Sequence, residues 1–306
     1  MELSSYDFET YIKPIWEGDT VYHESFLPLL NKDGTMDDVR LLFPVSEIIS
    51  LRSSDLQTEY VEGKDFEVVK GVIKLKLDGA INFMKYEQYF PDGPLLDNDT
   101  FPRNDVPNGL IIYGHGTKLH KISLDVTYKH NRPYFGPVPQ NKGKNLPKLQ
   151  EKLKNNAPVK IIYYGDSITT GDNSTICYNT PPYAPRWTEM TTKWLETYYK
   201  NTNITAEMTA MGGRQSDWGL EAAKERVADH KPDLAFIAFG MNDGSGRRNP
   251  ENFYDNIKGI VEITKKDNPD CAFVLISPML PHAIVNRFLG YQEAYIHGLL
   301  RLEQEG

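Results

Sequence analysis

From Val159 onward the chain alternates between strand-like and helix-like patterns, and this alternation is the feature that most constrains its fold. Residues 234–239 are apolar, which is typical of a parallel strand covered on both faces. Helix-period patterns separate such runs. The expected strands cover 159–164, 204–208, 234–239 and 271–277, and the expected helices 186–200, 217–230, 249–266 and 291–304. The pattern predicts an α/β fold with a flavodoxin-like α/β/α doubly wound parallel sheet.

The first part of the chain has a different pattern, in which short strands are separated by turns. From 73 to 78, apolar and charged residues alternate, which is typical of an antiparallel sheet with one face in water. Expected strands cover 39–43, 47–51, 58–61, 66–69, 72–77, 110–113 and 122–128. This pattern predicts an all-β sandwich or jelly-roll domain.

The boundary between the two patterns is rich in Pro, Gly and Lys, as linkers often are. We therefore predict a β-domain at 1–135, a linker at 136–158 and an α/β domain at 159–306. A chain of 306 residues is long enough for two domains that each bury a core.

Composition narrows the choice of partners. The formal net charge is −8, whereas nucleic acid and anionic membranes require clustered Lys and Arg, so we expect neither as a partner. Cys177 and Cys271 form no metal-binding spacing, and no cofactor or metal is predicted. The N-terminus shows no signal-peptide pattern and no apolar run reaches membrane-spanning length, which predicts a cytoplasmic protein. The oligomeric state is left open.

Three loops after the first three α/β strands carry residues suited to acyl transfer. They contain Ser167, the pair Gly212 and Gly213, and Asn242. Because the carboxyl ends of parallel strands meet at one edge, we expect these loops to lie together. A hydroxyl nucleophile with backbone N–H groups and an amide aimed at an oxyanion forms an ester-cleaving site. Taken singly, each residue also fits a turn or a helix cap, as does Ser216 at the expected start of helix 217–230.

Gly165-Asp166-Ser167-Ile168, Gly213 and Gly240-Met241-Asn242-Asp243 resemble the first three motif blocks of the SGNH (GDSL-type) esterases and acylhydrolases. The resemblance covers about 160–304. It implies Ser167 as nucleophile and an oxyanion hole of the Ser167 N–H, the Gly213 N–H and the Asn242 side chain, with Gly212 as the alternative to Gly213. A preceding β-domain resembles the two-domain carbohydrate esterases of this family. The implied substrate is a small acylated compound, an acetylated sugar above all.

The sequence departs from this family in its last motif block. The family's Asp-x-x-His, which supplies the general base and the residue that orients it, does not occur after Asn242. The expected last helix ends near Gly306 with no fifth strand, so we expect the sequence to stop short of a complete domain. His282, which follows the expected strand 271–277, is the remaining candidate base. His297 and His230 fall within or at the end of helices.

Two other functions remain open at this point. A carbohydrate-binding protein with an inactive esterase domain accounts for the missing histidine block. A flavodoxin-like phosphate or flavin binder has the same sheet order and a hydroxyl-rich loop after its first strand. Asp166 and Asp172 flank that loop here, and their charges oppose a bound phosphate.

Overall fold

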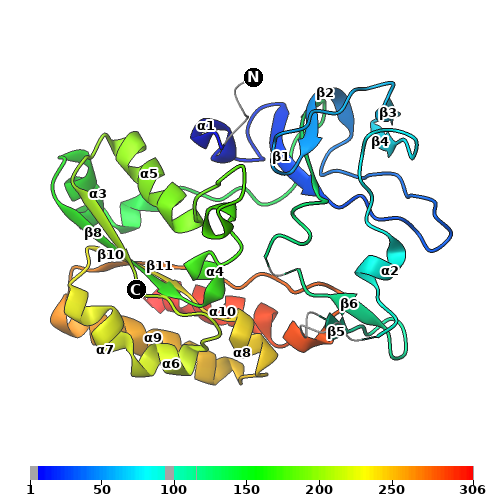
Figure 1. The fold of residues 1–306 in the computed structure, drawn as a ribbon. Coiled ribbons are helices and arrows are strands. Elements are labelled where there is room, and N and C mark those ends of the chain that lie inside the picture. Colours follow the sequence, from blue (N-terminus) through cyan, green and yellow to red (C-terminus); the bar gives the residue numbers. More distant parts are fainter. Residues whose placement is uncertain (1–5, 94–99, 115, 306) are drawn as a thin grey trace. The chain divides into compact units, whose positions relative to one another are not determined.

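A computed structural model describes residues 6–93, 100–114 and 116–305 (Figure 1). Gly306, expected to close the last helix, lies outside them. The chain forms two compact units. One contains Met1–Pro139 and Asn173–Pro185, and the other contains Gln140–Asp172 and Arg186–Gly306. Residues 173–185 fall within the predicted α/β domain but cluster with the first unit.

The second unit is built on a four-stranded parallel sheet. Its strands are β8 (Val159–Gly165), β9 (Ile204–Met208), β10 (Leu234–Ala238) and β11 (Ala272–Leu275), in the order β11-β10-β8-β9. Helices α3 (Pro147–Lys154) and α5 (Trp187–Tyr199) pack on one face, and α9 (Pro250–Asp267) and α10 (Gln292–Glu305) on the other (Figure 1). The predicted α/β/α doubly wound sheet is therefore confirmed.

Strand β8 supplies side chains to the cores on both faces of this sheet. Ile161 and Tyr163 pack with the α3 and α5 side, whereas Ile162 and Tyr164 pack with the α9 and α10 side. Successive residues of a strand point to opposite faces, and both faces of this sheet are covered by helices. All four side chains are therefore buried. A central strand covered on both sides reads as a continuous apolar run, which is why its position could be predicted.

One predicted helix of this unit is wrong in detail. Residues 217–230 form α6 (Ser216–Glu221), α7 (Ala223–Arg226) and a 3₁₀ turn, η3 (Ala228–His230), instead of one helix. The backbone leaves the helical region at Val227, with φ −129° and ψ −61°. The Val227 side chain is fully buried in the core, so the helix is interrupted at a packed position.

In its described residues, the first unit contains three small antiparallel sheets. Strands β1 (Thr20–Phe26), β7 (Leu124–His130) and β2 (Val45–Ser53) form one, in the order β1-β7-β2. The other two are hairpins, β3 (Phe66–Val69) with β4 (Val72–Leu75), and β5 (Thr100–Pro102) with β6 (Leu110–Ile112). Two short helices are α1 (Phe8–Tyr11) and α2 (Tyr86–Tyr89). A separate β-domain is confirmed, but a jelly roll is not.

Two expected strands of this unit are absent from the described structure. Residues 39–43 and 58–61 make only isolated bridges, Val39 to Ile73 and Glu59 to Arg52. Val39 and Phe43 are both buried, as two residues on the same face of a strand would be. The backbone nevertheless bends at Leu42 and Phe43 and forms no strand. The Phe43 N–H donates to the Tyr128 hydroxyl at 3.1 Å, and its ring stacks on His130. Side-chain packing therefore replaces a strand ladder here.

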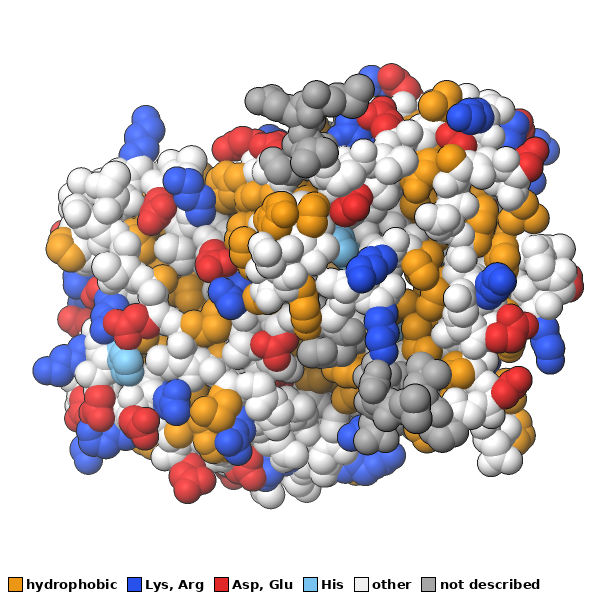
Figure 2. All heavy atoms as spheres, in the orientation of Figure 1, with side chains coloured by type: hydrophobic (Ala, Val, Ile, Leu, Met, Phe, Trp, Pro, Cys, Tyr) orange, Lys and Arg blue, Asp and Glu red, His pale blue; other side chains and the backbone are white. Residues whose placement is uncertain are grey.

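Figure 2 shows Lys and Arg side chains interspersed with Asp and Glu on the face that it presents. In the part of the chain that the structure describes, no helix combines the length and apolar composition needed to cross a bilayer. The cytoplasmic location and the absence of a nucleic-acid partner stay predictions.

We expect Gly165→Ala to destabilise the protein by about 1–3 kcal/mol, because overpacking a tight site forces backbone shifts. A Cβ at Gly165 would lie 2.2 Å from the Ala238 carbonyl oxygen, where β8 pairs with β10. Urea denaturation measures the loss. Gly93→Ala is the matched control, since no heavy atom lies within 4 Å of a Cβ at Gly93. Equal midpoints for both variants would contradict the close approach at Gly165.

Candidate active site

The loop after β8 places Ser167 at the start of a short helix, α4 (Ser167–Thr170). Asp166 caps this helix, and its carboxylate accepts a hydrogen bond from the Ile168 N–H at 3.0 Å. The start of α5 holds α4 in place, because Trp187 Nε1 donates to the Ile168 carbonyl oxygen at 3.0 Å. Ser167 is half-buried, and neither its hydroxyl nor its N–H has a hydrogen-bond partner among the described residues. Both groups are therefore available to a substrate.

The loop after β9 runs back along the end of β8, where the Met211 N–H donates to the Gly165 carbonyl oxygen at 3.0 Å. A Cβ built at Gly212 would lie 3.6 Å from the Ser167 Cβ, so this glycine faces the serine. Gly213 has φ +74° and open space around it. Within the described ranges, neither glycine N–H donates a hydrogen bond. Both remain available as oxyanion donors.

The loop after β10 carries Asn242 on helix α8 (Met241–Ser245). Its side-chain Nδ2 donates to the Asp166 carboxylate at 3.3 Å and to the Arg214 carbonyl oxygen at 3.1 Å. One amide thus joins the loop of Ser167 and the loop of Gly213 to its own. These two hydrogen bonds agree with the expectation that the three loops meet at one edge of the sheet.

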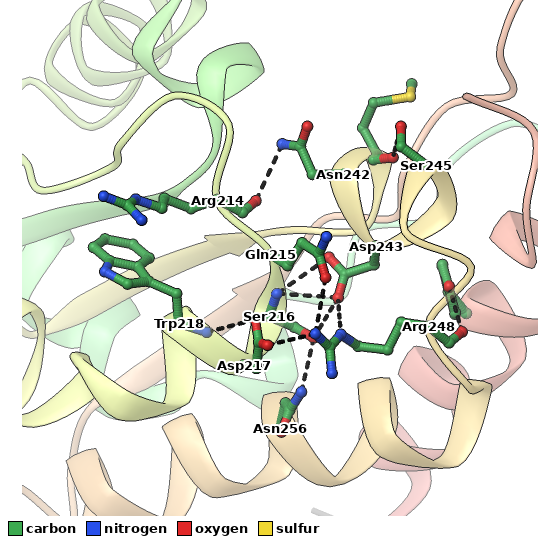
Figure 3. Close-up of polar contacts among 12 residues, drawn as sticks. Arg214, Gln215, Ser216, Asp217, Trp218, Asn242, Asp243, Ser245, Arg248 and Asn256 are labelled. Carbon is green, nitrogen blue, oxygen red and sulfur yellow. Dashed lines mark hydrogen bonds and ion pairs between the residues drawn. The ribbon is translucent and has the colours of Figure 1, made fainter. Parts of the chain in front are cut away.

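Beneath these loops lies a buried polar cluster centred on Asp243, whose exposed fraction is 0% (Figure 3). Its carboxylate accepts from the Ser216 N–H at 3.0 Å and from the Ser216 hydroxyl, and lies 3.3 Å from Arg248 Nε. Arg248 also donates to Gln215 at 2.8 Å and pairs with Asp217. The cluster fixes the loop of Gly213 against the loop of Asn242.

Burial shifts the acidity of both aspartates in this region. Asp166 exposes 2% of its surface, and desolvation raises its pKa to about 6 despite the Ile168 N–H bond, with a further contribution from the charge of Asp243. Desolvation likewise raises the pKa of Asp243, against the hydrogen bonds from Ser216. The site therefore holds two carboxyl groups that are harder to ionise than exposed ones.

The candidate bases do not contact Ser167 in the described structure. His282 is exposed on the loop after β11, where its Nδ1 accepts from the Ile284 N–H at 3.4 Å. His230 pairs with Glu207 at 2.6 Å, and His297 is exposed on α10. No imidazole is thus hydrogen-bonded to the Ser167 hydroxyl within the described ranges. The described residues contain no group of three or more His, Cys, Asp or Glu side chains arranged to hold a metal ion.

Sequence reasoning missed the polar residues that organise these loops. Ser216 was expected to cap helix 217–230, but Gln215 is the N-cap of α6 and Ser216 is its first residue. Asp243, from another loop, accepts the Ser216 N–H instead. The signal that could have indicated such a role is the carboxylate next to each candidate, Asp166 beside Ser167 and Asp243 beside Asn242.

Residues 163–301 match the model of the GDSL-like Lipase/Acylhydrolase family, which confirms the resemblance predicted from the sequence. No curated protein matches the chain.

Among solved structures, the chain is similar to a two-domain esterase (CEX) active on acetylated mannans, at 24% identity and a TM-score of 0.36. The match covers 44% of this chain and 34% of that esterase, so the chain spans about a third of its length. A putative GDSL-like lipase from Parabacteroides merdae is 18% identical, with a TM-score of 0.40 and coverages of 48% and 73%. The acetyl xylan esterase AlAXEase is 16% identical, with a TM-score of 0.38 and the same coverages.

Proposed function

Because residues 163–301 match the GDSL-like Lipase/Acylhydrolase family, we propose that this protein is a serine esterase that hydrolyses small acyl esters, acetyl esters of carbohydrates above all. The observation that carries the proposal is the Asn242 amide, which bonds to Asp166 beside Ser167 and to Arg214 beside Gly213. A nucleophile and three candidate N–H donors thereby converge on one edge of the sheet.

In this proposal the Ser167 hydroxyl oxygen attacks the ester carbonyl carbon, and the alcohol leaves from the tetrahedral intermediate. The N–H groups of Ser167 and Gly213 and the Asn242 amide stabilise the oxyanion, with Gly212 as the alternative glycine. Water then hydrolyses the acyl-serine. Both amide hydrogens of Asn242 are already donated, one to Asp166 and one to the Arg214 carbonyl oxygen. To stabilise the oxyanion, Asn242 gives up its long 3.3 Å hydrogen bond to Asp166.

The Ser167 proton needs an acceptor, and the described residues place no imidazole against the hydroxyl. We therefore expect the 306-residue chain to hydrolyse 4-nitrophenyl acetate only about 10³–10⁴-fold faster than water, as serine hydrolases without a full triad do. Added imidazole should increase this rate by acting as an external base. The measurement is the initial rate of nitrophenolate release against imidazole concentration.

Ser167→Ala is the decisive control for this experiment. The variant should lose the part of the imidazole-dependent rate that exceeds reaction in protein-free buffer, because no nucleophile remains to be deprotonated. His282→Ala should behave as the unmodified chain, since its exposed ring makes its hydrogen bond within its own loop in the described structure. Equal imidazole dependence for Ser167→Ala and the unmodified chain would refute Ser167 as nucleophile. Loss of activity in His282→Ala would assign that residue as the base.

The second candidate is a carbohydrate-binding protein with an inactive esterase domain. The observation in its favour is the absence of an imidazole contact to Ser167 among the described residues. Binding of acetylated xylo-oligosaccharides without release of acetate, with or without imidazole, would favour this function over the esterase.

A further inference from the structure

A guanidinium group extends from the loop that carries the candidate oxyanion donors. Arg214 follows Gly213, and its own carbonyl oxygen accepts the Asn242 amide at 3.1 Å. Its side chain points away from Asn242 toward Trp218 (Figure 3). The charged group is thus held within one side-chain length of the place where the ester carbonyl would bind.

Arg214 differs from Arg248 and Arg226 in its partners. Arg248 pairs with Asp217 and Asp243, and Arg226 lies 3.6 Å from Glu225. In the described structure Arg214 forms no ion pair with a carboxylate. Its Nε donates at 3.1 Å to the sulfur of Met211, which is a weak acceptor, and its Cζ lies 5.2 Å from the ring centroid of Trp218. These contacts orient the guanidinium without neutralising its charge.

The guanidinium lines an open hollow of about 400 Å³ beside the candidate site. The lining residues are Gly213, Arg214, Gln215, Asp217, Trp218 and Glu221. Two of them are acidic and oppose an anion. Asp217 is paired with Arg248. Glu221 lies at the far end of α6, about 7.5 Å along the helix axis from Ser216 at 1.5 Å per residue. The end of the hollow next to Gly213 is therefore the one where positive charge prevails.

From this placement we propose that Arg214 binds a carboxylate on the alcohol portion of the ester, so that the substrate is an acylated acidic sugar of the uronic-acid class. The proposal rests on the proposed esterase function. A planar guanidinium binds a carboxylate through two parallel N–H bonds, and the flat face of Trp218 keeps that plane in position. Such a contact selects among esters because it forms only with the charged substrate.

The test compares 4-acetoxybenzoate with its methyl ester, which differ only in the free carboxylate, in the presence of imidazole. Arg214→Gln should lower the ratio of kcat/KM for the acid over the methyl ester about 5- to 10-fold, as expected for one partly exposed ionic contact. Arg214→Lys should restore part of the ratio, because lysine keeps the positive charge but lacks the planar guanidinium that binds a carboxylate through two parallel hydrogen bonds. Raising the salt concentration to 0.5 M should reduce the ratio of the unmodified protein alone.

Arg226→Gln is the matched control, because Arg226 also lies over the Trp218 ring, at 5.9 Å, but has a carboxylate neighbour. It should leave the ratio unchanged. An unchanged ratio in Arg214→Gln would overturn the proposal, as would an equal loss in Arg226→Gln.

A binding measurement separates this proposal from the esterase function. Tryptophan fluorescence should report binding of tri-galacturonate to the unmodified protein and at least 5-fold weaker binding to Arg214→Gln, with no comparable response to a neutral trisaccharide. If neither ester is hydrolysed but this difference is seen, the esterase function fails and the acidic-sugar site stands. If both esters are hydrolysed and tri-galacturonate binds equally to both proteins, the site fails and the esterase stands.

Discussion

Replacing Asn242 by alanine should lower kcat by about 10²–10³-fold with little change in KM, because the oxyanion donor that we propose it to be acts mainly in the transition state. The Asn242 amide is the side-chain donor held at the meeting point of the three loops, by Asp166 and by the Arg214 carbonyl oxygen. The measurement is steady-state hydrolysis of 4-nitrophenyl acetate at saturating imidazole.

The matched control is Asn249→Ala. Asn249 caps α9, with its side chain accepting from the Glu251 N–H at 2.9 Å. Its loss should cost about 1 kcal/mol of stability, as cap removal does, and leave kcat unchanged. A large rise in KM with unchanged kcat for Asn242→Ala would assign that amide to ground-state binding instead of the oxyanion.

Asp166→Asn should gain stability relative to the unmodified protein as the pH rises. Desolvation raises the folded-state pKa of Asp166 to about 6 from its ordinary value of 3.8. The carboxyl is neutral in both states below pH 3.8 and carries its full penalty above pH 6. The stability penalty of this group therefore develops between these values and reaches about 3 kcal/mol at pH 7, at 1.36 kcal/mol per pKa unit.

The measurement is the free energy of unfolding of both proteins in urea at pH 4, 5, 6 and 7. Any cost of placing an amide at this site is the same at every pH. The change with pH in the difference between the two free energies of unfolding therefore reports on the carboxyl group alone. The charges of Asp166 and neighbouring Asp243 repel each other. Removing the Asp166 charge relieves this repulsion and also increases the stability of the variant as the pH rises. Glu262→Gln, on an exposed position of α9, should show no such change. If the difference in free energy of unfolding between Asp166→Asn and the unmodified protein stayed constant from pH 4 to 7, this would contradict the raised pKa.

The α/β sheet could be predicted from the sequence because its strands are buried on both faces and end at abrupt polar loops. The expected strand 204–208 coincides with β9, and the Asn249 cap with Pro250 fixed the start of α9. The first unit was harder to predict. Residues 39–43 have strand-forming side chains, but Phe43 packs on His130, 87 positions away, and no local pattern encodes that contact.

The candidate site could be predicted to the level of its loops, since parallel strands end at one edge. The contacts between loops could not. Asp166 with Asn242, and Asp243 with Ser216 and Arg248, are pairs of polar residues from different strands, whose partners depend on the sheet order and on burial. The sequence shows that these residues are present, whereas their pairing requires the fold.

The chain passes between its two units at three places, near residues 139, 172 and 185. Segment 173–185 is held within the first unit by polar contacts: the Pro182 carbonyl oxygen accepts from the Tyr6 N–H at 3.0 Å, that of Pro181 lies 2.9 Å from His120 Nε2, and the Asn173 side chain accepts from the Gly116 N–H at 3.2 Å. Cutting the chain once near residue 139 would therefore not separate the two units, because segment 173–185 of the C-terminal fragment belongs to the first unit. A fragment starting there would carry thirteen residues without their native neighbours, two residues beyond the helix that bears Ser167.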